Sequence, residues 1–345
     1  MKTRIIIASA ALAAITLAAC SRDEAPVREP EPEYTLKVNV GIPATRAVIA
    51  AGNTDDMTAH TVQVFVYNAS GQLEKTSGMK DYGSDISLTI SPGAKTVWAL
   101  VNAPLESGPA SLDDFPVTST PLSANTPSNL VMSGYAGVTV TGNDDITVNV
   151  RHIAAKVVLD KITRSFENAA YAGIPMTLTA IYMSNVAAVS DYDVTGAEPS
   201  EWICKKGILA DPPVCANLLV DAPLNGDLGE GKTYSTVHTF YVYPNPTGED
   251  SDAEEWCARK TRLVLKCDYN GRVCYYPITI PGSGPESNAD VIERNKVYHI
   301  TALTLTRPGS TDPDSKYPEV SSDVNCTFQI TVSNWEEDYT YTETF

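Results

Sequence analysis

The sequence is poor in the patterns that build a catalytic or metal site. Its histidines lie far apart, and no pair has the His-x-His or His-x-x-x-His spacing of metal ligands; they are His60, His152, His238 and His299. No Gly-x-Ser-x-Gly nucleophile motif and no glycine-rich phosphate loop is present. The acidic stretches 249–255 and 312–314 lack the spacing of a calcium loop and are interpreted as solvated loops. We therefore expect no metal, no cofactor and no enzymatic activity.

Positive charge is also scarce. The 345 residues include 25 lysines and arginines against 42 aspartates and glutamates, which gives a formal net charge of −17. Nucleic acids and anionic lipid surfaces attract basic patches, so neither is an expected partner. The excess of carboxylates instead suits a protein that stays soluble outside the cell.

The N-terminal apolar segment is too short to anchor the chain as a membrane helix. Residues 5–19 carry no charge, follow the basic residues Lys2 and Arg4, and fall short of the ~20 residues that a spanning helix needs. Small residues directly precede Cys20, as in the lipobox of bacterial lipoproteins. We therefore expect residues 1–19 to be a signal peptide and Cys20 to be acylated, which would attach the chain to a membrane. The alternative is an ordinary secretory signal with a chance cysteine.

The other six cysteines all lie in the second half of the chain, at positions 204, 215, 257, 267, 274 and 326. In an exported protein an even number permits up to three disulfides, in any of fifteen pairings. An Asn270-Gly271 turn would place Cys267 opposite Cys274 in a hairpin, within reach of a disulfide. Whether this pair is oxidised or reduced stays open at this point.

Hydrophobic residues alternate along many short segments, and no sustained helical period is present. The clearest case is 34–42, where Tyr34, Leu36, Val38, Val40 and Ile42 share one face. Further strands are expected at 62–67, 86–90, 95–101, 138–140, 146–150, 176–183, 236–243, 262–267, 273–280, 297–306, 326–332 and 339–345, with room for a short helix in 108–132. The pattern predicts antiparallel β-sandwiches, with a domain boundary near residues 150–165.

Several segments together resemble one family, the fimbrillins that form the type V pili of Bacteroidales. The matching segments are the lipobox with 34–48, Val64-Phe65-Val66-Tyr67-Asn68-Ala69-Ser70-Gly71, Trp98-Ala99-Leu100-Val101-Asn102, Arg151-His152-Ile153-Ala154-Ala155-Lys156-Val157, Glu293-Arg294-Asn295-Lys296-Val297-Tyr298-His299-Ile300-Thr301 and Val332-Ser333-Asn334-Trp335. Each motif is short, but together they extend over essentially the whole chain.

The resemblance implies an all-β protein of two tandem transthyretin-like antiparallel β-sandwich domains, at 47–155 and 156–345. It also implies a route to the cell-surface fimbrium: the lipidated precursor reaches the outer membrane, and an arginine-specific protease cuts the loop after the first strand. In this sequence the cut would fall between Arg46 and Ala47, so that residues 20–46 are a lipidated propeptide. Arg46 as an ordinary loop arginine is the alternative.

Removal of the first strand would need a replacement. The five apolar residues of 34–42 would each lose roughly 1.5–3 kcal/mol of burial, which together rivals the stability of a whole domain, ~5–15 kcal/mol. The expected donor is the C-terminal segment 326–345 of the next subunit. Its apolar positions change parity near Asn334, which predicts two strands joined by a kink or bulge; the donor residues named here are Trp335, Tyr339, Tyr341 and Phe345. A C-terminal strand that pairs within its own domain is the alternative.

The expected partners follow from this route: other copies of the chain or related pilin subunits, the outer membrane through the lipid, the protease, and host or bacterial surface receptors for adhesion. Two other functions stay open. If Arg46 is not cut, the lipidated chain would anchor the base of a pilus. Alternatively, the chain is a surface glycan-binding lipoprotein of a polysaccharide-uptake system that uses loop aromatics such as Trp202 and Trp256 as sugar platforms.

Overall fold

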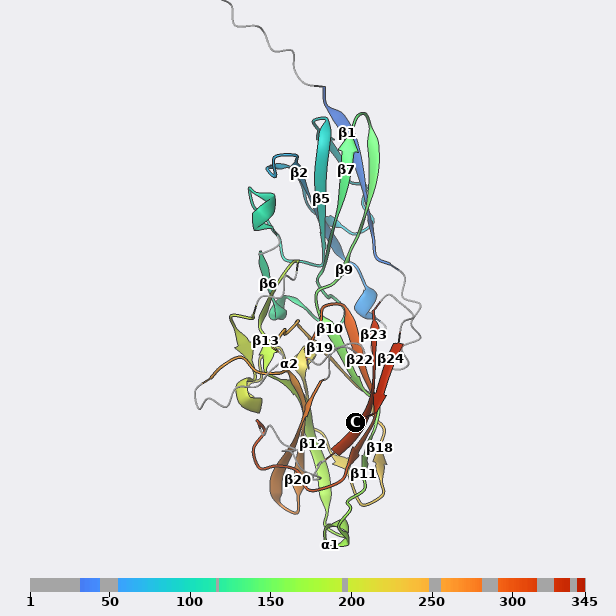
Figure 1. Ribbon diagram of the computed structural model, residues 1–345, viewed down its shortest axis with the longest axis vertical. Coiled ribbons are helices and arrows are strands. Elements are labelled where there is room, and N and C mark those ends of the chain that lie inside the picture. Colours follow the sequence, from blue (N-terminus) through green and yellow to red (C-terminus); the bar gives the residue numbers. More distant parts are fainter. Residues whose placement is uncertain are drawn as a thin grey trace, which may run out of the picture. The chain divides into compact units, whose positions relative to one another are not determined.

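β-Strands form nearly all of the regular structure (Figure 1), as predicted. The computed structural model describes residues 32–43, 55–115, 118–193, 198–247, 256–280, 291–314, 326–335 and 340–344. The predicted signal peptide, Cys20, Arg46, Ala47, Tyr339 and Phe345 lie outside these residues. No helix within the described ranges is long and apolar enough to cross a membrane.

Two sheets are built from the first half of the chain. The smaller has the order β4 (Ser87–Ile90), β1 (Tyr34–Gly41) and β8 (Asp144–Asn149). The larger is antiparallel, with the order β3 (Leu73–Asp81), β2 (Thr61–Asn68), β5 (Gly93–Val101), β7 (Met132–Val140) and β9 (Arg151–His152). Valines from β2 and β5 pack against Leu36 and Val38 of β1 in one apolar cluster. Side chains alternate between the two faces of each strand, so the apolar faces of the two sheets pack against each other.

The second half of the chain forms two further sheets. One contains β18 (Thr233–Tyr234), β11 (Ile162–Arg164), β22 (Lys296–Leu305), β10 (Ala155–Leu159) and β19 (His238–Val242), with β23 (Cys326–Asn334) beside β22 and β24 (Thr340–Thr344) beside β23. The other contains β16 (Val220–Asp221), β12 (Met176–Ser184), β20 (Arg262–Tyr269) and β21 (Arg272–Thr279), with β17 (Gly226–Asp227) beside β12.

Short elements connect these sheets. The remaining strands pair as β13 (Val186–Ala187) with β15 (Trp202–Ile203), and as β14 (Val189–Asp191) with β6 (Ser119–Pro121). The helices are α1 (Ala169–Ala172) and α2 (Ala216–Leu219), and the 3₁₀ turns are η1 (Asp55–Met57), η2 (Leu112–Asp114), η3 (Leu122–Ala124) and η4 (Lys205–Gly207). The helix expected in 108–132 is thus replaced by the two 3₁₀ turns η2 and η3.

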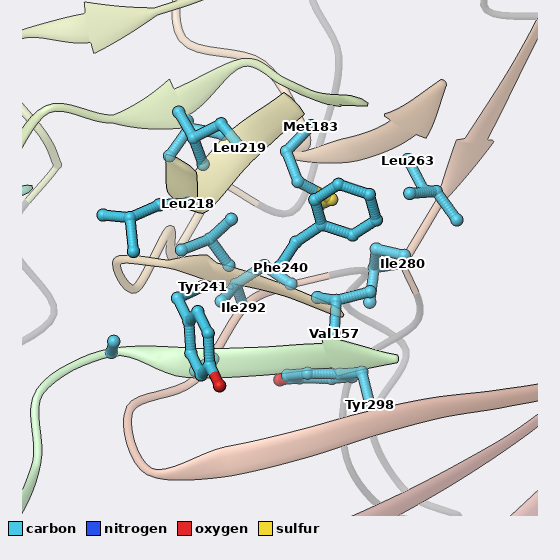
Figure 2. Close-up of a cluster of buried hydrophobic side chains, with 14 of the residues drawn as sticks. Val157, Met183, Leu218, Leu219, Phe240, Tyr241, Leu263, Ile280, Ile292 and Tyr298 are labelled. Atoms are coloured by element: carbon cyan, nitrogen blue, oxygen red, sulfur yellow. The ribbon is translucent and has the colours of Figure 1, made fainter. Parts of the chain in front are cut away.

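The main core fills the space between the two sheets of the second half. Figure 2 shows Phe240 of β19 pointing toward Met183 of β12, with Val157 of β10 on the same side, and all three side chains are buried. This core continues onto the second face of β2 and β5, where Phe65 and Trp98 are buried. Residues 33–345 therefore form one compact unit, and the domain boundary predicted between 155 and 156 stays a prediction.

The structure confirms the predicted hairpin at Asn270-Gly271. Both turn residues have positive φ, 54° and 79°, as a two-residue hairpin turn requires, and Cys267 lies opposite Cys274. The structure holds these two cysteines as thiols, and burial raises the pKa of the Cys267 thiol. The register is confirmed, while the disulfide stays a prediction.

Two details of the predicted sheets are wrong. The chain reverses after Asn334, so that β23 and β24 form an antiparallel pair, whereas the change of parity predicted a kink or bulge. The sheets are also not purely antiparallel, because β1 runs parallel to β8 and β22 runs parallel to β10 and β11. Alternation reveals a strand but not the direction of its neighbour.

Leu36 is the residue on which the docking of β1 depends most, because its side chain is fully buried in the cluster between the first two sheets. We expect Leu36→Ala to lower the free energy of unfolding of the uncleaved chain by about 2–5 kcal/mol. Lys37→Ala is the matched control: it changes the next residue, whose side chain is exposed, and should change stability by less than about 0.5 kcal/mol. Equal effects in urea titrations of the two variants would contradict the proposed burial.

Candidate functional site

β1 is a central strand, held on both edges by strands distant in sequence. It pairs antiparallel with β4, from Tyr34 opposite Ile90 to Lys37 opposite Ser87, and parallel with β8, from Leu36 opposite Asp144 to Gly41 opposite Asn149. Figure 1 shows β1 in blue within the sheets of the first half. Removal of this strand would leave a groove with unpaired backbone groups on both walls, which is a template for another strand.

The ends of β1 are held by additional hydrogen bonds. The Thr35 amide donates to Oδ1 of Asn143 at 2.9 Å, and the Tyr82 hydroxyl donates to the Val40 carbonyl at 2.9 Å. Partial burial of the phenol raises the pKa of Tyr82. Both contacts use the backbone of β1, so they would accept a replacement strand of different sequence.

The side chains of β1 alternate as predicted, but they are not equally buried. Leu36 and Val38 are 0% and 3% exposed, whereas Tyr34, Val40 and Ile42 are half-buried. The two buried residues alone contribute about 3–6 kcal/mol by burial. The estimate that counted all five residues as fully buried is therefore too high, and the centre of the groove carries most of its affinity for a strand.

Asn102 explains why a strand of the family motif ends in asparagine. Its φ is 58°, a left-handed conformation that asparagine tolerates better than most residues. Its Oδ1 accepts the His60 amide at 2.8 Å, and its Nδ2 donates to the carbonyls of Thr58 at 2.7 Å and Leu130 at 3.1 Å. Asn102 thereby fixes the segment that leads from η1 into β2.

A buried ion pair fixes η1 itself. Lys156 of β10 donates to the Asp56 carboxylate at 2.6 Å, and their side chains are only 6% and 5% exposed. The Tyr241 hydroxyl donates to the same carboxylate at 3.3 Å, and Nε2 of His152 lies 2.9 Å from the Asp56 carbonyl. Asp56 stands ten residues after Arg46 in the sequence, so these contacts hold the chain soon after the predicted cut.

Trp335 belongs to the same cluster. Its side chain is 1% exposed and stacks on the His152 ring at 4.0 Å, and its amide donates to the Asn295 carbonyl at 3.0 Å. Trp335 is therefore packed in the core of its own chain. Its role in a donor strand stays a prediction.

β24 follows Trp335 and lies at the edge of its sheet. It pairs with β23 in the register Gln329 opposite Thr344 to Ser333 opposite Thr340, and with no other described strand. Figure 1 shows β24 beside β23 in red. In the single chain, the C-terminal segment is thus self-paired, although through one neighbour alone.

Arg294 belongs to the segment 293–301, which resembles a fimbrillin motif, and it connects the two halves of the compact unit. Its guanidinium donates to the carbonyls of His152 at 3.1 Å, Tyr192 at 2.9 Å and Ser133 at 2.9 Å. The next residue, Asn295, has φ of 58°, and its amide donates to the Ala154 carbonyl at 3.2 Å. These bonds fasten the start of β22 to β7 and β9.

The remaining candidate residues have structural partners. His60 lies against the Ser128 carbonyl, His238 against Asp221 and His299 against Asp160, so the histidines are separated as their spacing indicated. Asp314 pairs with Arg259 and Arg262. Within the described ranges no cluster of potential metal ligands is formed.

Trp202 and Trp256 do not form an open platform. Their rings meet edge to face at 5.6 Å, and the Lys205 ammonium lies over the Trp256 ring at 5.2 Å. The most exposed aromatic side chain among the described residues is instead Tyr135, at 57%. Half-buried and exposed residues alternate along β7, and Tyr135 occupies one of the exposed positions. This alternation is the sequence feature that could have predicted its exposure.

The comparison with known proteins adds to this picture of an all-β chain with a paired central strand. Residues 34–179 match the family model of the major fimbrial subunit protein (FimA). This match is confined to residues 34–179 and agrees with the fimbrillin resemblance of the sequence. No curated protein matches the chain.

Solved structures show the same fold. A candidate cell adhesion protein from Bacteroides eggerthii DSM 20697 is 21% identical with a TM-score of 0.65, over 89% of this chain and 97% of that chain. The fimbrilin (fimA) of Porphyromonas gingivalis W83 is 17% identical with a TM-score of 0.60, over 88% and 97%. The C-terminally truncated tip fimbrial protein Mfa3 of Porphyromonas gingivalis is 13% identical with a TM-score of 0.51, over 88% and 100%.

The buried His152 predicts a pH-dependent stability. Burial lowers its pKa to about 4, with Arg294 and Lys156 acting in the same direction and Asp56 opposing them. The unfolded chain, with an ordinary histidine pKa of about 6.5, binds this proton first, so stability falls as the pH drops from 6.5 to 4, by up to about 3 kcal/mol. Unfolding free energies measured between pH 7 and 4 should show a shallower decline in His152→Gln than in the unchanged protein.

The exposed His60 offers the matched control. His60→Gln should retain the pH dependence of the unchanged protein, because it leaves the buried contacts of His152 intact. A His152→Gln variant with the same decline as His60→Gln would show that other groups cause the acid sensitivity.

Proposed function

We propose that this chain is a pilus subunit that is exported as a lipoprotein through Cys20, cut after Arg46 and polymerised by donor-strand exchange. The observation that carries the proposal is the central position of β1 between β4 and β8. A cut after Arg46 would separate β1 from the rest of the chain and allow it to leave. The fimbrial family of residues 34–179 supports assembly with other pilin subunits at the cell surface.

The geometry of the groove defines the incoming strand. It would run parallel to β8 and antiparallel to β4, with apolar side chains in the places of Leu36 and Val38. Main-chain hydrogen bonds would supply affinity and the two side-chain sites would supply specificity. The segment after Trp335 is the donor candidate, because β24 pairs with one described strand alone.

The processing step predicts a difference between two arginines. Arg46 follows β1, whereas Arg28 precedes it, so only a cut after Arg46 frees the groove. We expect cell-surface protein to begin at Ala47 and to form ladders on unheated dodecyl sulfate gels. Arg46→Ala should abolish the ladder, and Arg28→Ala should leave it unchanged.

Edman sequencing and intact mass distinguish the alternatives. A surface protein that retains an acylated Cys20 in the unchanged chain would overturn the processing step and identify an uncut anchor or another surface lipoprotein. Ladders that persist in Arg46→Ala would show that polymerisation does not need this cut.

If the segment after Trp335 is the donor, its deletion should prevent assembly without preventing the monomer from folding. Deletion of 336–345 removes β24 but retains Trp335 in the core, so the monomer should fold with nearly unchanged thermal stability. The truncated subunit should form no ladder by itself. It should still accept a strand from an intact subunit, because its own groove is complete. A ladder formed by the truncated subunit alone would exclude this segment as donor.

A further inference from the structure

A pocket opens where β5 and β7 meet the start of β22. Its volume is about 520 Å³, which lies within the ~300–1,000 Å³ of small-molecule sites, and its wall includes Trp98, Tyr135, Asn149, Arg151 and Lys296. Of these residues, Asn149 also pairs with Gly41 of β1 at the end of the groove. The pocket combines an exposed aromatic ring with several cations.

The aromatic wall is rigid. The Tyr135 ring is 57% exposed and stacks on Trp98 with ring centroids 4.7 Å apart and 29° between the planes. Trp98 is buried and stacks in turn on Phe115 at 4.5 Å. One face of Tyr135 is therefore supported from behind, which leaves its exposed side as a flat apolar surface at the pocket.

The backbone beneath this ring has a shape that only glycine permits. A Cβ on Gly134 would lie 2.1 Å from the Asn149 carbonyl oxygen, so the chain of β7 passes directly against the end of β8. This close approach brings Tyr135 and Asn149 to the same pocket. The arrangement is part of the fold and does not depend on a flexible loop.

The lining also includes several cations, although the whole chain carries a net charge of −17. Arg151, Arg294 and Lys296 line the pocket with one carboxylate, that of Asp193. Arg294 is fixed by its bonds to the carbonyls of Ser133 and Tyr192, and its side chain is 19% exposed. A positive site on an acidic protein favours an anion there.

We propose that this pocket binds a carboxylate-bearing sugar. Such a ligand has an apolar C–H face that can lie on Tyr135, a carboxylate that Arg151 and Lys296 can attract, and hydroxyl groups within reach of the Asn149 amide. A simple anion would make no use of the aromatic wall, and a neutral sugar would make no use of the cations. The inference does not rest on strand exchange, because the pocket belongs to the single chain.

The decisive comparison uses glucuronic acid and glucose, which differ in the carboxylate at one carbon. Full-length chain is titrated with each sugar by saturation-transfer NMR and calorimetry, and N-acetylneuraminic acid is titrated in parallel. We expect the acidic sugars to bind at least about tenfold more tightly than glucose. The stronger of the two acidic sugars distinguishes a uronic-acid polymer from a sialylated glycan as the source. Equal binding of glucose and both acids, or no binding up to about 10 mM, overturns the proposal.

Two variants test the two walls separately. Tyr135→Ala and Lys296→Gln should each weaken binding of the preferred acid about tenfold or more, and Tyr171→Ala, which removes another exposed tyrosine, should not. Acetate at the same concentrations should not compete. Retained binding in Tyr135→Ala, or full competition by acetate, would reduce the site to a nonspecific anion site and overturn the assignment to a sugar. Because these tests use the monomer, they keep their meaning if the ladder experiments fail.

Discussion

The rest of this structure depends on the double pairing of β1. A strand at the middle of a sheet satisfies the backbone groups of two neighbours, and among the described strands β1 alone joins β4 and β8 into one sheet. Unpaired backbone groups that stay buried cost about 1–3 kcal/mol each, in addition to the lost burial of Leu36 and Val38. The sheet of β4, β1 and β8 therefore needs a strand in this place, but the backbone contacts do not require that the strand be its own.

The elements that would move in such an exchange are bordered by elements that are firmly held. The ion pair of Asp56 and Lys156 fixes the chain after the predicted cut, and the stack of Trp335 on His152 fixes the chain before β24. Both contacts belong to one buried cluster at β9 and β10. In the proposed exchange, this cluster would hold both adjoining segments while β1 leaves and β24 extends, so neither change would need to spread into the core.

The sequence alone was sufficient for features that depend on local pattern. Alternation located β1 and most other strands, and the turn preference of Asn270-Gly271 fixed the register of Cys267 with Cys274. It could not show that β1 lies parallel to a strand more than 100 residues away, because the period of two identifies a buried face and not the neighbour across the sheet. β3 was missed because its polar sequence leaves most residues at least partly exposed. The ionic and aromatic cluster was equally hidden, since Asp56, Lys156 and Trp335 meet only through tertiary packing.

The same topology explains why exchange would be favourable once the groove is empty. β24 is held at its present edge by five registered residue pairs with β23. A strand in the place of β1 makes four pairs with β4 and six with β8, and it also covers the apolar sites of Leu36 and Val38. Each additional net hydrogen bond is worth about 0.5–1.5 kcal/mol. A strand that moves from one neighbour to two gains both hydrogen bonds and burial, whereas the occupied groove of the uncut subunit offers it neither. In the proposed route, the cut would determine when assembly begins, and the pairing of the central strand would determine its direction.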